Sequence, residues 1–251
     1  MFRTRPAAPV AAGDGFRWRG TEVSRLEALS DAVFGFVLTL LVVSLEVPRT
    51  AGELLQTMRG FGAFAAAFAL LFLVWFNQHR FFRRYGLQDT TPHVLNAALL
   101  FCIIFFAYPL KFIAGLVIAL ILGQPLAVSQ PDGSTVPLFT SWAEAVATMN
   151  VFSTGYIAVW LVFALLHLHA FRLRRRLELS ELEVYDTLDN VRESMINVTL
   201  GALSVLVALT TSAAFVGFVY WLVGPVMWAH GVWSGRRRTR LRARLAAVPA
   251  E

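Results

Sequence analysis

The chain has 251 residues, of which 57% are hydrophobic and only 15% are charged, and its mean hydropathy is +0.61. This composition excludes an ordinary soluble domain and indicates an all-α, polytopic membrane protein. The net charge of +6 comes from arginines that lie between the apolar spans, a pattern that sets membrane orientation. We therefore expect the lipid bilayer as a partner, and no nucleic acid.

The two ends of the chain differ from its middle. Residues 1–24 hold Arg, Pro, Gly and Ala without the apolar core of a signal peptide, so they predict a loose cytoplasmic tail. Residues 25–235 form the predicted membrane domain. Residues 236–251 begin with a run of arginines and predict a basic cytoplasmic tail.

Six apolar segments are each near the roughly 20 residues that a helix needs to cross a bilayer. In chain order they cover residues 31–47, 58–78, 93–122, 148–170, 192–209 and 213–233. Pro109 is expected to kink the long third span, and Lys111 to reach the outer interface. Arginine clusters follow the second, fourth and sixth spans, which predicts that both termini are cytoplasmic.

The first span carries the strongest functional signal. Residues 25–48 read RLEALSDAVFGFVLTLLVVSLEVP, so Ser30 and Asp31 lead directly into an apolar run. A charged side chain at mid-membrane costs about 2.5 kcal/mol or more, which makes Asp31 a functional candidate. Ser and Asp also suit the first turn of a helix as capping residues, so both interpretations stay open.

Apolar side chains recur along one stripe of the first span, with a threonine beside them: Phe36, Leu40, Val43, Val47 and Thr39. Such a stripe is ordinarily lipid contact or core. If several copies surround an axis, it instead forms a hydrophobic constriction that gates ions by dewetting. The Thr39 hydroxyl would then replace part of an ion's hydration shell, and Glu46 would form an acidic ring at the outer mouth.

The sequence offers no catalytic or metal-binding set. His167 and His169 are two residues apart, so they point to different sides of a helix and make a poor metal pair. Cys102 is the single cysteine, which excludes a disulfide within the chain. We expect no enzyme activity, no cofactor and no resident metal.

Two stretches resemble a known family. Residues 25–31, RLEALSD, and the apolar run after them resemble the R-x-x-x-F-S-D signature and first helix of the transmembrane protein 175 family, although the signature Phe is Leu29 here. These are lysosomal potassium channels and their prokaryotic relatives. Trp75, Asn77 and His79 are similar to the Trp/Asn/His end of the family's second helix. The six-span layout and the length are similar to those of prokaryotic members.

The resemblance implies a homotetramer in the cell membrane, with the first helix of each subunit lining a potassium-preferring leak pore. Potassium ions would occupy the pore only transiently. By position, the family's hydrophobic constriction falls on Phe36, where relatives usually carry Ile or Leu. Further pore-facing layers fall on Thr39, Leu40 and Val43.

The resemblance also implies a polar network at the inner end of the pore. The signature residues Arg25, Ser30 and Asp31 would hold the first helices together through contacts with the Trp and His of the second span. Pairing of Asp31 with Arg25 or His79 would avoid an unpaired charge near the membrane.

Two other functions remain open on the sequence. A proton- or cation-coupled transporter would use Asp31, Glu46 and His79 as a relay, although only Gly35 offers a helix break for a substrate site in the first span. A membrane scaffold, whose polar inner ends only lock helices together, would conduct no ions.

Overall fold

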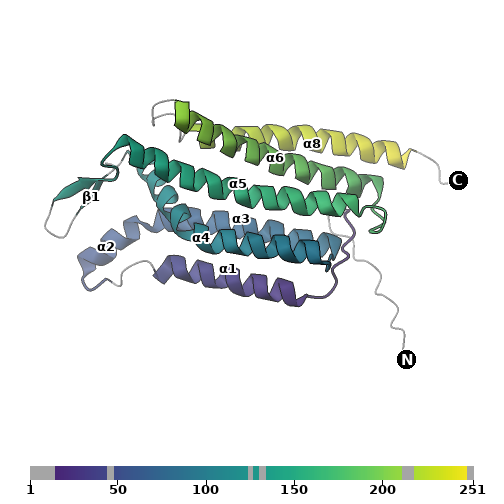
Figure 1. Cartoon of the computed structure of the whole chain (residues 1–251), viewed down its shortest axis with the longest axis horizontal. Coiled ribbons are helices and arrows are strands. Elements are labelled where there is room, and N and C mark those ends of the chain that lie inside the picture. The colour runs from purple at the N-terminus through teal and green to yellow at the C-terminus, as the bar shows by residue number, and fades with distance from the viewer. Residues whose placement is uncertain (1–14, 44–47, 124–126, 130–133, 211–217, 248–251) are drawn as a thin grey trace.

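The computed structural model describes residues 15–43, 48–123, 127–129, 134–210 and 218–247, which form a bundle of long helices (Figure 1). The helices are α1 (Arg25–Val43), α2 (Ala51–Arg59), α3 (Phe61–Tyr85), α4 (Thr90–Ile121), α5 (Trp142–Arg172), α6 (Glu181–Thr210), α7 (Phe218–Trp221) and α8 (Val223–Ala246). Strands β1 (Ala127–Ser129) and β2 (Thr135–Pro137) pair in an antiparallel hairpin.

Five helices in the described part of the chain are long and apolar enough to cross a membrane: α1, α3, α4, α5 and α6. They correspond to the first five spans expected from the sequence. The sixth expected span begins among residues 211–217, which lie outside the described residues, and continues through α7 into the first half of α8. The polytopic membrane architecture is therefore confirmed, and the sixth crossing stays a prediction.

Two helices begin with the same reciprocal capping pattern. At α1 the Ser24 hydroxyl accepts from the Glu27 N–H at 3.2 Å, and the Glu27 carboxylate accepts from the Ser24 N–H at 2.8 Å. Ser180 and Glu183 repeat this arrangement at α6. The cap of α1 is therefore Ser24, so the interpretation of Ser30 and Asp31 as capping residues is wrong.

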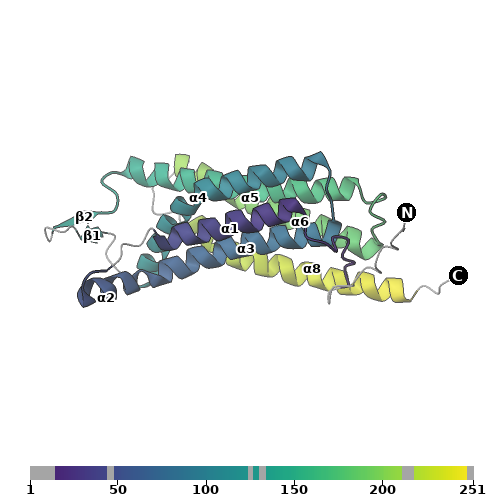
Figure 2. The same ribbon diagram turned by 90° about the horizontal axis from the view of Figure 1, so that it is seen from below.

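The bundle is built outward from α4 and α5. Helix α1 packs against α3 and α4, α5 joins α4 to α6, and α8 lies along α6 (Figures 1 and 2). Gly155 lets α4 and α5 approach closely, because a Cβ at this position would lie 1.9 Å from the Phe106 ring. Pro109 lies inside α4, and Lys111 ties α4 to the C-terminal part of α1 by donating to the Leu41 carbonyl at 3.3 Å.

The described ends of the chain lie at the same end of the bundle, where α1 begins and α8 finishes (Figure 1). We call this the inner end, after the orientation expected from the sequence. Helix α2 and the hairpin lie at the opposite end. Residues 15–24 were expected to belong to a loose tail, which is wrong for this part, because Phe16 is buried under Arg84 and Tyr85 at the inner end of α3. Phe16 thus anchors this segment to α3.

Candidate functional site: the two faces of α1 and its inner end

Helix α1 has one packed face and one uncovered face. Its packed face consists of Ser30, Phe34, Val37 and Leu41, which are all buried. The predicted pore residues lie elsewhere on the helix: Phe36 is 58% exposed, Val43 is 69% exposed, Thr39 is exposed and Leu40 is half-buried. The stripe predicted from the sequence is thus left largely uncovered in the single chain.

The Thr39 hydroxyl donates to the Gly35 carbonyl at 2.8 Å, which is the usual local bond of a helical threonine. Because this bond uses the hydroxyl proton, the oxygen lone pairs remain available on the uncovered face. Two predicted residues lie outside the described residues: Glu46, the predicted outer-mouth residue, and Val47 of the predicted stripe.

Asp31 joins α1 to α3 through a tryptophan. The Trp75 indole N–H donates to the Asp31 carboxylate at 2.7 Å, and the indole stacks on the His79 ring at a centroid distance of 5.4 Å. Pairing of Asp31 with Arg25 or His79 was expected and is absent among the residues that the structure describes. The Trp75 indole therefore contacts both Asp31 and His79.

Two more of the predicted network residues, Arg25 and Asn77, make no polar contact across helices within the described chain. Arg25 is exposed and has no polar partner there. Asn77 donates to the Leu73 carbonyl of its own helix at 3.0 Å. In the single chain, these side chains contribute nothing to holding α1 on α3.

A buried amide chain, missed in the sequence, fixes α1 to its neighbours. Asn96 of α4 donates to the Ser30 hydroxyl at 2.9 Å and accepts from the Gln78 amide of α3 at 3.0 Å. Ser30 in turn donates to the Leu26 carbonyl at 2.8 Å. All three side chains are 0–1% exposed, so the three helices are joined by hydrogen bonds shielded from lipid and water. The sequence feature that could have indicated this hydrogen-bond chain is the asparagine, Asn96, inside the apolar run LNAALLF.

Replacing Asn96 by alanine is expected to lower the free energy of unfolding by about 1–3 kcal/mol, because Ser30 loses a donor and Gln78 an acceptor in a buried setting. Asn77→Ala is the matched control, since it removes a bond within one helix, and its effect should stay within about 0.5 kcal/mol. Equilibrium unfolding in mixed micelles measures both. Equal effects would show that the amide chain does not hold the helices.

Comparison with known proteins bears on the same helices. The family model described as the endosomal/lysosomal potassium channel TMEM175 matches residues 25–106, which span α1 to the middle of α4. A potassium channel of Marivirga tractuosa is 31% identical over 238 residues, covering 92% of this chain and 96% of the relative. The chain belongs to the TMEM175 family. The family is one of channels and not of enzymes, as the sequence led us to expect.

Two further comparisons agree with this assignment. The crystal structure of a variant of the potassium channel MtTMEM175, in complex with a nanobody–MBP fusion protein, matches with a TM-score of 0.75 and 30% identity over 90% of this chain and 100% of that one. A potassium channel of Chamaesiphon minutus is 33% identical over 102 residues, which cover 38% of this chain and 50% of that channel.

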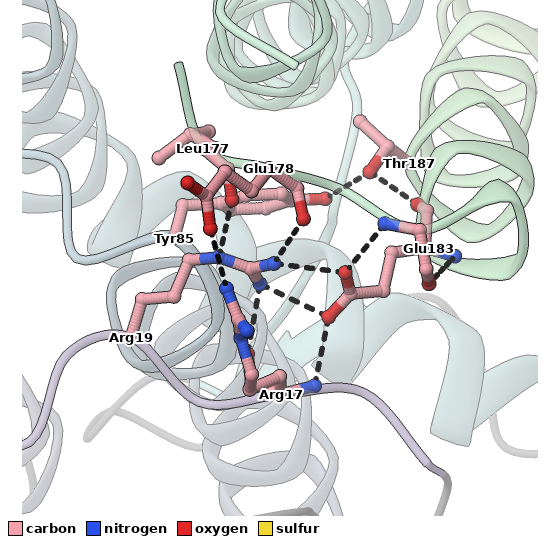
Figure 3. Close-up of polar contacts among 8 residues, drawn as sticks. Arg17, Arg19, Tyr85, Leu177, Glu178, Glu183 and Thr187 are labelled. Carbon is pink, nitrogen blue, oxygen red and sulfur yellow. Dashed lines mark hydrogen bonds and ion pairs between the residues drawn. The ribbon is translucent and has the colours of Figure 1, made fainter. Parts of the chain in front are cut away.

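In this TMEM175 family member, a second polar assembly closes the inner end of the bundle (Figure 3). Its centre is Arg19, on the segment that leads into α1. The guanidinium binds the Glu183 carboxylate with two nitrogens, at 3.0 and 2.8 Å. It also donates to three carbonyl oxygens, those of Arg17, Leu177 and Glu178. These five bonds match the donor capacity of the guanidinium.

We call residues 15–24 the N-terminal strap. Its backbone is bonded to α3, because the Arg19 and Gly20 N–H groups donate to the Arg83 carbonyl at 3.1 and 3.0 Å. Gly86 makes room for it: this residue has a φ of +58°, and a Cβ there would lie 2.9 Å from the Arg19 carbonyl. The strap therefore joins the inner ends of α1, α3 and α6.

Proposed function

We propose that this chain assembles as a homotetramer in the cell membrane and forms a potassium-preferring leak channel, with α1 of each subunit lining the pore. The relatives of matching length and fold are named potassium channels. The observation that carries the proposal for this chain is the uncovered face of α1, where the predicted pore residues are exposed while the opposite face is packed on α3 and α4.

In this proposal Phe36 forms the hydrophobic constriction. Four phenylalanine rings close a narrow apolar layer in which water is unfavourable, so an ion crosses only when the layer wets. Thr39 lies one turn outward, about 4.5 Å along the helix axis, and its hydroxyl replaces part of the hydration shell of an arriving cation. Leu40 and Val43 continue the lining, and Glu46 concentrates cations at the outer mouth.

The polar inner end has a supporting role. The Asp31–Trp75 bond and the Ser30–Asn96–Gln78 chain orient α1 on α3 and α4 within each subunit. Arg25 is exposed in the single chain, so we assign it to contacts between subunits. Both termini are cytoplasmic in this proposal, and α7 with the apolar first half of α8 provides the sixth crossing.

Ion flux into liposomes that contain the purified protein tests this function. We expect passive uptake under a potassium gradient, at a higher rate than under a matched sodium gradient, without any pH gradient. Flux that requires a pH gradient would favour the coupled transporter. No flux from folded protein would favour the scaffold.

Asp31→Asn separates the channel from the transporter. The amide of asparagine still accepts the bond from Trp75 but carries no proton to transfer, so we expect passive potassium flux to stay within about threefold of wild type while the assembly loses stability. Flux per assembled tetramer, measured after size-exclusion chromatography, checks this. Complete loss of flux with intact assembly would contradict the channel and support a proton relay.

A further inference from the structure

A long apolar crevice lies on the side of the bundle away from α1. It consists of two adjoining cavities, each of about 370 Å³. Residues of α3, α4, α5 and α8 line both of them: Leu70, Leu110, Phe152, Tyr156 and Val223. This is the size and lining of a site for a small apolar molecule. No residue of α1 takes part, so the crevice is separate from the proposed pore.

The crevice differs between its two ends. The outer cavity, which extends toward Ile121, Met149 and Trp221, has an almost wholly apolar lining. The inner cavity adds two polar residues of α6, Glu193 and Asn197. A molecule that fills both cavities must therefore have an apolar body and a polar group at one end only.

At the polar end of the crevice, the main hydrogen-bonding group available to a ligand is an acceptor, the Glu193 carboxylate. The Asn197 amide is engaged by its own helix and by Met227, and its oxygen accepts from the Tyr156 hydroxyl. The Glu193 carboxylate has neither a hydrogen bond nor an ion pair in the part of the chain that the structure describes. A carboxylate that accepts no hydrogen bond at an apolar wall is costly, and a bound donor lowers that cost.

Three charged residues act on the Glu193 carboxylate: Arg80 and His230 attract it, and Asp189 repels it. The His230 ring lies 3.5 Å from the Asp189 carboxylate, and the Arg80 guanidinium lies over the Phe76 ring. Asp189 itself accepts from the Ser234 hydroxyl. A ligand head that carries its own positive charge and N–H donors suits Glu193, whereas a negatively charged head would meet like charge.

We propose that this crevice binds a single-chain amphiphile with an amine head. The ammonium group donates to the Glu193 carboxylate at the inner membrane interface, and the alkyl chain extends outward along Tyr156, Phe152 and Leu110. The exposed Gly224 and Trp221 lie along the opening through which a molecule enters from the lipid.

Binding is testable without any measurement of ion flux. Trp160 lines the inner cavity, so a brominated dodecylamine bound there should quench part of the tryptophan fluorescence of the channel in phosphatidylcholine nanodiscs. Trp160→Phe should remove that part of the quenching. Brominated laurate, with the same chain and a negative head, should bind at least about tenfold more weakly.

Two variants and a control locate the site. Glu193→Gln should weaken amine binding about tenfold or more while leaving a brominated dodecanol unaffected. Gly224→Leu should abolish binding of both, because Gly224 lines the inner cavity and a leucine there would occupy part of it. Gly231→Leu, an equally open glycine further along α8, should change neither.

Three outcomes would overturn the proposal: equal affinity for the amine and for laurate, amine binding that survives Gly224→Leu, or an unchanged affinity in Glu193→Gln. The last result with quenching retained would mean that the crevice holds only the tails of ordinary phospholipids. Because every readout is binding, failure here would leave the proposed channel function untouched.

Discussion

Replacing Phe36 by alanine is expected to raise passive potassium flux about tenfold or more, because the change removes four rings from the narrowest apolar layer of the proposed pore. A wider layer wets more easily and no longer excludes a hydrated ion. The side chain is 58% exposed in the single chain, so its removal leaves no cavity in the core and should not impair folding. Potassium flux into liposomes, normalised to assembled protein, measures the effect.

The control for this experiment is Phe101→Ala on α4. Phe101 is also an exposed phenylalanine of a membrane helix, at 71%, but it does not lie on α1. We expect its flux to equal that of the wild type. If Phe36→Ala leaves flux unchanged, or if both variants raise it equally, then Phe36 is not a constriction and the uncovered face of α1 is lipid contact.

Replacing Arg19 by methionine is expected to lower the free energy of unfolding by about 3–5 kcal/mol, the usual cost of removing one partner from a buried ion pair. The Arg19 and Glu183 side chains are only 11% and 6% exposed, so Glu183 would keep a buried charge without its partner. Three carbonyl oxygens would lose their donor as well. Methionine preserves most of the side-chain length, which isolates the loss of charge and donors.

Arg17→Met provides the comparison for this variant. Arg17 pairs with Glu178 at 3.6 Å, but the two side chains are 43% and 80% exposed, so water screens the pair. We expect a change of about 0–1 kcal/mol. Equilibrium unfolding in mixed micelles checks both variants. If both variants lower the free energy of unfolding by similar amounts, then the strap stabilises the fold through its net charge and not through the specific bonds of Arg19.

The membrane class and the first five spans could be predicted from the sequence because a bilayer imposes a length and a composition on each crossing helix. The contact of Asp31 with the second span followed from the family signature. Its partner within that span did not, since the choice between Trp75 and His79 depends on the rotation of α3, which periodicity does not set.

The amide chain and the strap escaped prediction for a related reason. Asn96 stands alone in an apolar run, and Gln78 is one of several polar residues near the end of α3. Only the packing of α1, α3 and α4 brings Asn96 to both Ser30 and Gln78. The strap carries a single buried aromatic residue, Phe16, and its main partner Glu183 lies far along the sequence. The local sequence pattern around Arg19 gives no information on a partner so far away in the chain.

The bond between Arg19 and Glu183 joins residues 164 positions apart, which has a consequence for synthesis. At about 5–20 residues per second, Glu183 leaves the ribosome roughly 10–30 s after Arg19. During that interval α1 to α5 are made, and the segment before α1 can contact α3, but the Arg19 guanidinium still lacks its carboxylate partner. The inner end of the bundle is therefore finished only after α5 and the start of α6 have been made, and chains that stop earlier are left without this closure.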